Sequence, residues 1–519
     1  MRLMASRQIA STTAGRVASS RGLPVGSTPY SSTSWGERYQ RKKPLVKQIV
    51  LLFRINWCTI LSPGSELLLV LDFCDEPSKH VGDFCLDRMK HCKTQRERDQ
   101  LVIEALLRKL GPLSQVEIHE LTHFQRSAIS GLVRDLLKQE RLVEAGRSNN
   151  SRGRKQVLLR LNEEHGFVLG IGFDDEAVLA AVMNLHLRII STSREETRLD
   201  SGMDELLDQL LSSANKAIKQ AGINEESLLG IGVAGSGLVN SREGTMVMSS
   251  TIEFLNQVPL RHIFEKVFSA PVMVLNLAGA KAVAERTLGA GAMADDMIYV
   301  EYGKTGIGAG IISNGKLMHG ARHAAGELGH THMIEEGPAC KCGSFGCLEA
   351  IAGAAAIQTK IRKAIADGGG SEVLALADGN PANVSGWMIL SAAKAGDKAC
   401  AAIVEQAANY LGLGLANLVN LFNPSVLVLD QRLKLAGQGL LDQVTKVVKR
   451  QALSYSTKNM RILFGKLSEA SVLGAGSIAL EKHFEIPTLK PPRFMIESLS
   501  RLSRRGSQIE SPPEGFEAG

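Results

Sequence analysis

Three cysteines and one histidine lie within eighteen residues of one another and constrain the fold more than any other feature of the chain. His330 is followed by Cys340, Cys342 and Cys347, with nine, one and four residues between successive members. Three thiolates and one imidazole satisfy the tetrahedral preference of Zn²⁺ and leave no position for water, so we expect one structural zinc ion. A set of buried free thiols is the alternative, but close clustering without a secretion signal disfavours it.

Two carboxylates flank this cluster and suggest a ligand pocket. Glu327 precedes His330 by three residues, and Glu349 follows Cys347 by two. If one ring nitrogen of His330 binds zinc, the other N–H becomes a fixed donor. A donor beside two acceptors suits the hydroxyl groups of a sugar. The carboxylates could instead support the zinc ligands, and the two roles are compatible.

The composition indicates several domains of the α/β class. A chain of 519 residues exceeds one ordinary core, so we expect two to four domains. Abundant glycine (51 residues) and few aromatics (5%) favour an α/β body over a sandwich or barrel. The net charge of +7 permits a nucleic-acid partner without requiring one. No apolar run is long enough to span a membrane, and we expect a cytoplasmic protein.

The chain divides into five segments. Residues 1–93 show no periodicity, and we interpret them as an uncharacterised, largely disordered extension. Their first forty residues contain one acidic residue and resemble an organellar transit peptide in composition, although a start codon placed too far upstream or a disordered extension is favoured. Residues 94–164 form a helical block with a hairpin, 165–285 and 286–485 alternate strands with helices, and the proline-rich tail 486–519 is expected to be disordered.

The segment 94–164 begins with two helices. Apolar residues recur at helical spacing from Leu101 to Leu110, and Gly111-Pro112 ends that helix. Ser114 and Glu117 have the spacing of a capping box, which predicts a second, short helix with Val116, Ile118 and Leu121 on its apolar face.

A third helix and a hairpin complete this segment. The third helix is expected from about Arg126 to Gln139, after a tight turn, and this arrangement predicts a helix-turn-helix. The stretches 141–146 and 156–161 can pair as two strands with a basic tip, which is the wing of a winged helix.

The exposed side chains of this segment are suited to double-stranded DNA. Polar and basic residues on the third helix suit major-groove edges, and basic residues of the wing tip suit phosphates. The expected DNA-binding residues are Arg126, Ser127, Ser130, Arg134, Arg152, Arg154 and Lys155. The alternative is a three-helix protein-interaction module with a solvated basic loop. Helix order, wing and charge together favour DNA binding.

Glycine-rich stretches recur at three places in the α/β segments. We interpret them as turns that follow apolar strands, at 170–172, 230–237 and 305–310. Each is a weak signal on its own, because glycine turns are common in α/β folds. In kinases such turns approach phosphates through backbone N–H groups.

The full set of motifs resembles the ROK family, which contains repressors and sugar kinases. The resemblance covers about residues 95–480. Its most specific parts are Gly326-Glu-Leu-Gly-His330 and Cys340-Lys-Cys-Gly-Ser-Phe-Gly-Cys-Leu-Glu349, with support from Gly230–Gly235, Pro271–Asn276, Lys304–Gly310 and Leu411–Asn417. It implies an actin-like, ribonuclease-H-like pair of α/β lobes closing around a sugar. The winged helix-turn-helix head is the arrangement of the repressor branch.

Three departures from the family's kinases argue against phosphoryl transfer. Kinases carry a catalytic aspartate after the asparagine at 276, whereas this chain has Leu277, and loss of a positioned base costs on the order of 10²–10⁴ in rate. Where kinases show Asp-x-Gly-Gly-Thr, this chain reads Gly170-Ile-Gly-Phe-Asp-Asp175. Asp430-Gln431 replaces the glycine pair that kinases place beside the nucleotide.

The resemblance implies that the sugar contacts are better kept than the catalytic groups. Asn276, Glu327, His330 and Glu349 match the sugar-binding residues of the family. We therefore expect a transcriptional regulator, a repressor, that senses a sugar or sugar derivative and binds a DNA operator as a homodimer or dimer of dimers, without enzymatic activity. An ATP-dependent sugar kinase and a ligand-independent interaction protein are the alternatives.

Overall fold

The computed structural model describes residues 94–148, 155–200, 202–369 and 371–485. The expectations for the extension 1–93, for Arg152 and Arg154, and for the tail 486–519 concern residues outside this part of the chain. Within it, every helix is too short or too polar to cross a membrane.

Three helices and a small antiparallel sheet form the segment before the α/β body. The sheet has the strand order β1-β3-β2, and the helices precede it or lie between its first two strands along the chain. The elements are α4 (Gln95–Leu110), β1 (Leu113–Ser114), α5 (Gln115–Thr122), α6 (Arg126–Lys138), β2 (Leu142–Arg147) and β3 (Val157–Leu161). The predicted capping box is present, because Ser114 and Glu117 each accept a hydrogen bond from the other's backbone N–H.

The apolar faces of these helices meet in one core. On α6, Ile129, Leu132, Val133 and Leu136 are buried at helical spacing, while Leu137 is half-buried. On α4 the most deeply buried residues are Ile103 and Leu107. Leu101 and Leu110, between which the apolar pattern was predicted, are only partly buried.

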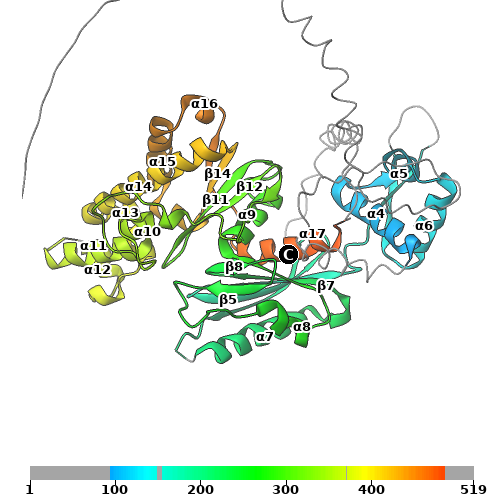
Figure 1. Cartoon of the computed structure of the whole chain (residues 1–519), viewed down its shortest axis with the longest axis horizontal. Coiled ribbons are helices and arrows are strands. Elements are labelled where there is room, and N and C mark those ends of the chain that lie inside the picture. The colour runs from blue at the N-terminus through cyan, green and yellow to red at the C-terminus, as the bar shows by residue number, and fades with distance from the viewer. Residues whose placement is uncertain (1–93, 149–154, 201, 370, 486–519) are drawn as a thin grey trace, which may run out of the picture. The chain divides into compact units, whose positions relative to one another are not determined.

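The first large sheet has the order β10-β7-β4-β5-β6. Strands β4, β5 and β6 form antiparallel neighbours, and β7 and β10 run parallel to β4. Helices α7 and α8 lie on one face and α17 lies on the other (Figure 1). The elements are β4 (Phe167–Phe173), β5 (Ala177–Asn184), β6 (Ile189–Glu196), α7 (Gly202–Ala221), η1 (Glu225–Ser227), β7 (Leu228–Gly235), β8 (Leu238–Asn240), β9 (Thr245–Met248), α8 (Leu260–Val267) and β10 (Val272–Asn276).

The second large sheet has the order β13-β12-β11-β14-β15 and carries most of the remaining helices. Strands β11, β14 and β15 are parallel, and β12 and β13 are antiparallel additions at one edge. The elements are α9 (Leu277–Thr287), β11 (Met297–Tyr302), β12 (Ile307–Ser313), β13 (Lys316–Leu317), η2 (Leu328–His330), α10 (Leu348–Ala352), α11 (Ala354–Ala366), α12 (Ser371–Leu376), η3 (Pro381–Asn383), α13 (Gly386–Ala395), α14 (Lys398–Phe422), β14 (Val426–Leu429), η4 (Gln431–Ala436), α15 (Gln438–Gln451), α16 (Ser454–Thr457), β15 (Arg461–Phe464) and α17 (Ala470–His483).

The interpretation of the glycine-rich stretches as turns is wrong for most of their residues. Gly170, Gly232 and Gly310 lie inside β4, β7 and β12. A Cβ at Gly232 would lie 1.9 Å from the carbonyl oxygen of Ala475 on α17, and one at Gly170 would lie 2.1 Å from that of Val472. These glycines therefore let α17 pack directly onto the strands, a requirement that depends on tertiary packing.

Helix α17 connects parts of the chain that are far apart in sequence. It falls in the range expected for the second lobe, yet it packs on β4 and β7 of the first sheet and on α9. At its end, the guanidinium of Arg108 on α4 lies 5.4 Å from the ring centre of Phe484. The same helix thus contacts both the first sheet and the helical segment.

Candidate functional site

The predicted cluster of one histidine and three cysteines is assembled in space. The ligand atoms of His330, Cys340, Cys342 and Cys347 all lie within 4.8 Å of one another. Nδ1 of His330 is 3.6 Å from Sγ of Cys340, and the Sγ atoms of Cys342 and Cys347 are 3.8 Å apart. Cys347 is buried at the start of α10, whereas Cys342 is exposed. Four donors converging in this way could hold one metal ion.

Backbone hydrogen bonds hold the cysteine loop in this shape. The N–H of Cys340 donates to the carbonyl of Ser344, and the N–H of Gly343 donates back to the carbonyl of Cys340. Gly346 has a φ of 65°, and a Cβ there would lie 1.8 Å from the carbonyl oxygen of Ile334. The tight approach at Gly346 therefore requires glycine.

The two ring nitrogens of His330 face different groups. Nδ1 faces the thiols, and Nε2 lies 3.9 Å from Oε2 of Glu327. Glu349 accepts a hydrogen bond of 3.1 Å from the N–H of Ile307, the first residue of β12. Burial raises the pKa of Glu349, and the Ile307 N–H opposes this shift. The structure thus brings Glu327, His330 and Glu349 together beside the cluster.

Asn276 and Leu277 stand at the end of β10 and the start of α9. The side chain of Asn276 caps α9 by accepting a 2.9 Å hydrogen bond from the N–H of Gly279. Leu277 is 6% exposed and belongs to an apolar cluster with Leu275 and Ala475. The described hydrogen bond of Asn276 is therefore local to its helix, and Leu277 serves packing.

A buried network of charged groups connects the second sheet to α9. Lys281 on α9 contacts Glu301 of β11 at 2.8 Å and Asp430 after β14 at 3.3 Å, and Tyr299 donates to Asp430 at 3.0 Å. Arg432 contacts Glu301 at 2.7 Å and Asp430 at 3.2 Å. Although burial opposes it, Lys281 and Arg432 hold the pKa of Asp430 well below its usual range.

The network reaches the first sheet through one carboxylate. Glu176, in the turn between β4 and β5, accepts from Arg432 at 3.2 Å and from the indole N–H of Trp387 at 2.9 Å. The guanidinium of Arg432 also lies 4.9 Å from the ring centre of Trp387. Sequence reasoning singled out Asp430 alone from this set, because the other members come from elements with no shared local motif.

The predicted DNA-binding residues of α6 form an exposed face. Arg126, Ser127, Ser130 and Arg134 are all exposed, and the hydroxyl of Ser130 donates to Gln115 of α5 at 3.0 Å. Lys155 is exposed just before β3.

These features define a class of protein: an α/β body of two five-stranded sheets, with a histidine–cysteine cluster and a preceding three-helix segment. A family comparison agrees with that description. The chain belongs to the ROK family, whose model matches residues 169–482.

Similar curated proteins include repressors and a transcriptional regulator. The xylose repressor of Caldicellulosiruptor bescii is 30% identical over 376 residues, which cover 72% of this chain and 93% of that protein. The DNA-binding transcriptional dual regulator NagC of Escherichia coli is 25% identical over 386 residues, covering 73% and 91%.

Solved structures share the same fold. A ROK family transcriptional regulator, a homologue of the E. coli MLC protein, has a TM-score of 0.64 at 22% identity and covers 75% of this chain and 97% of its own. A ROK family glucokinase of Streptomyces griseus, in complex with glucose and AMPPNP, has a TM-score of 0.55 at 28% identity and covers 60% and 99%. The fold therefore occurs in both regulators and kinases.

Proposed function

We propose that this protein is a sugar-sensing transcriptional repressor with a structural zinc ion. The observation that carries the proposal is that Glu327, Glu349 and the imidazole of His330 lie together beside the histidine–cysteine cluster, in a chain that also exposes a polar and basic helix face on α6. The similar proteins named xylose repressor and NagC support the same function.

Two separations within the cluster match those of a tetrahedral zinc site. Tetrahedral ligands at the usual Zn–S and Zn–N lengths lie about 3.6–3.8 Å apart. The separations of 3.6 Å between His330 and Cys340 and of 3.8 Å between Cys342 and Cys347 agree with this geometry. Such a closed site would hold the loop and orient Nε2 of His330 toward the ligand, with Glu327 and Glu349 as acceptors. Asn276, at the end of β10, completes the proposed sugar-binding set.

The charged network supports a regulator rather than a kinase. Leu277 occupies the position of the catalytic base, and its aliphatic side chain has no group that accepts a proton. It is buried among apolar side chains. Asp430, where kinases place glycine beside the nucleotide, is buried and engaged by Lys281 and Arg432. A nucleotide phosphate placed there would have to displace these ion pairs. We therefore propose that the domain senses a ligand without transferring phosphate.

We further propose that the segment 94–164 is a winged helix-turn-helix that binds double-stranded DNA. The order α4, β1, α5, α6, β2, β3 supports this, as does the exposure of Arg126 and Arg134 on α6. A homodimer or dimer of dimers would place two α6 helices on half-sites about one DNA turn apart. A sugar would regulate binding only if it favours one arrangement of the dimer over another.

One combined experiment tests the proposed function. Thermal unfolding of the zinc-loaded protein is followed with xylose, glucose and N-acetylglucosamine, and gel shifts with the DNA upstream of its gene are repeated with and without any stabilising sugar. We expect one sugar to raise the melting temperature and to weaken the DNA complex, and Glu349→Gln to abolish both effects. DNA binding absent at low salt, or rapid ATP-dependent phosphorylation of a sugar, would overturn the proposal.

A further inference from the structure

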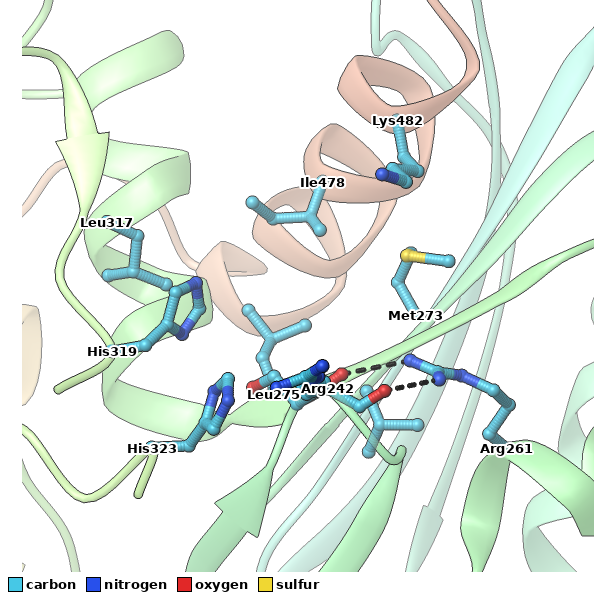
Figure 2. A pocket seen from close by; sticks show the side chains of 11 residues that line it. Arg242, Arg261, Met273, Leu275, Leu317, His319, His323, Ile478 and Lys482 are labelled. Carbon is cyan, nitrogen blue, oxygen red and sulfur yellow. Dashed lines mark hydrogen bonds between the residues drawn. The ribbon is translucent and has the colours of Figure 1, made fainter. Parts of the chain in front are cut away.

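A pocket with a volume of about 400 Å³ lies between the last helix and the edge strands of both large sheets. It is separate from the proposed sugar site, because none of its lining residues belongs to the metal cluster or to the sugar-binding set. Figure 2 shows Ile478 and Lys482 of α17 on one side of it, His319 and His323 on another, and Met273 on strand β10.

The lining combines an apolar surface with positive charge. Met273, Leu275, Leu317 and Ile478 supply the apolar part. The remaining side chains with charge or titratable nitrogen are Arg242, Arg261, His319, His323 and Lys482, and none of the 11 lining residues carries a carboxylate. Two carboxylates border the pocket without lining it: Glu485 forms an ion pair with Lys482 at 2.5 Å, and Glu243 lies near His323. The pocket therefore favours an anion that also has an apolar body.

Hydrogen bonds fix the orientation of Arg261, whereas one ring nitrogen of His323 lacks a partner in the part of the chain that the structure describes. The guanidinium of Arg261 donates to the carbonyls of Ser241 and Arg242 at 2.9 and 2.7 Å, as Figure 2 shows, which holds that loop at the pocket. Nδ1 of His323 is buried and has no hydrogen-bond partner among the described residues. A buried polar atom without a partner is costly, and a ligand that draws the ring of His323 toward the pocket removes this cost.

We propose that this pocket is a second ligand site, which binds a small organic anion through His323 and the charges of Arg242 and Lys482, with the apolar body of the ligand against Met273 and Ile478. The volume falls within the range of small-molecule sites, which is about 300–1,000 Å³. This site goes beyond the proposed sugar sensing, since it uses different residues and a different ligand chemistry.

Helix α17 couples this site to the helical segment. Its last turn presents Lys482 to the pocket, while Phe484, two residues later, lies under the guanidinium of Arg108 on α4. Glu481 faces the same arginine, whose charge counteracts the rise that burial causes in the pKa of Glu481. A ligand that shifts the last turn of α17 therefore shifts a direct contact of α4. A ligand in the pocket would therefore change a contact of the segment proposed to bind DNA.

Binding is tested by isothermal titration calorimetry of the zinc-loaded full chain. The probes are phenyl phosphate and phenylacetate, with benzyl alcohol as an uncharged probe of similar shape. We expect saturable binding of at least one anion and none of benzyl alcohol. His323→Ala should weaken binding of the anion at least about tenfold, since a hydrogen bond to a charged group is lost. Ile478→Trp should abolish binding by filling the pocket.

Matched variants separate this site from the sugar site. His262→Ala removes an exposed histidine of α8 and should leave anion binding unchanged. Glu349→Gln should abolish sugar stabilisation but leave anion binding intact. Circular dichroism and zinc content verify that each variant is folded. Absence of saturable binding by both anions, or equal binding by wild type, His323→Ala and Ile478→Trp, would overturn the second site.

Hydrogen exchange tests the coupling. Saturation with the bound anion should change amide protection in the last turn of α17 and in α4, and Phe484→Ala should remove the change in α4 while leaving binding in place. If binding leaves exchange in α4 unchanged in the wild-type protein, the coupling through α17 is refuted although the site stands.

Discussion

The guanidinium of Arg432 lies 3.2 Å from Oε2 of Glu176, although the two residues are 256 positions apart. Glu176 belongs to the turn between β4 and β5 of the first sheet, and Arg432 follows β14 of the second. Because Arg432 also contacts Glu301 and Asp430, this one side chain joins a half-exposed carboxylate to a buried charge network. The contact ties the turn between β4 and β5 of the first sheet to the residues that follow β14 of the second.

The two partners of this contact should differ in their importance for stability. Arg432→Met would leave the buried Asp430 and Glu301 with Lys281 as their only remaining cation in the network, and breaking a buried ion pair costs about 3–5 kcal/mol. Glu176→Gln keeps an acceptor for Trp387 and removes a partly exposed charge, which should cost at most about 1 kcal/mol. Urea unfolding measures both. Similar losses for the two variants would contradict the described network.

Removal of one cysteine should abolish binding of the proposed zinc ion. Cys347 is 1% exposed and supplies one of the four donors, so Cys347→Ser should lower the zinc content from one ion per chain to nearly none. The melting temperature should fall sharply, since structural zinc contributes about 10–16 kcal/mol of binding free energy in small zinc domains. Cys400→Ala is the control, because Cys400 is buried in α14 outside the cluster. Full zinc occupancy in Cys347→Ser would exclude the assigned ligand set.

Glu104 should make stability depend on pH. Burial raises its pKa from 4.5 to about 7, even though Arg141 opposes the shift. The folded state then binds the proton more tightly than the unfolded chain does. The stabilisation of the folded state by protonated Glu104 amounts to about 3 kcal/mol. It is fully present below about pH 4.5 and is lost as the pH rises through about 7. The difference in unfolding free energy between wild type and Glu104→Gln should show this fall.

A surface variant supplies the control for that titration. Glu120→Gln changes an exposed carboxylate of α5. Its unfolding free energy should follow that of the wild type across the same pH range. Parallel curves for wild type and Glu104→Gln would show that the buried carboxylate does not titrate in this window.

Residues of α6 and of the loop before β3 should affect DNA binding differently. Arg126→Ala or Arg134→Ala should reduce discrimination between operator and unrelated DNA by about 1–3 kcal/mol. Lys155→Ala should weaken binding to all sequences and reduce the salt dependence by about one counterion. Fluorescence anisotropy at several salt concentrations measures both effects. Arg98→Ala, on the exposed side of α4, should change neither, and equal loss of specific and unspecific binding in Arg134→Ala would argue against base contacts.

Local features of the fold followed directly from the sequence. The capping box of Ser114 and Glu117, the buried face of α6 and the convergence of His330 with its three cysteines depend on residues that are near one another along the chain. Short-range geometry restricts such groups before any distant contact forms. The positions of Glu327 and Glu349 along the chain also predicted that both carboxylates would flank the histidine–cysteine cluster.

Tertiary structure alone decided the features that depend on distant partners. The glycines at 170, 232 and 310 were predicted to be turn residues. They lie in strands against which α17 and α9 pack, and nothing within a few residues of them along the chain indicates this close approach. The contact of Arg432 with Glu176 and the pocket beneath α17 likewise join side chains from separate elements. The sequence by itself determined the histidine–cysteine cluster and the helix faces, since these depend on residues that are close along the chain. The charge network between the two sheets and the pocket beside α17 each join residues that are far apart along the chain. Only the folded chain brings these residues together.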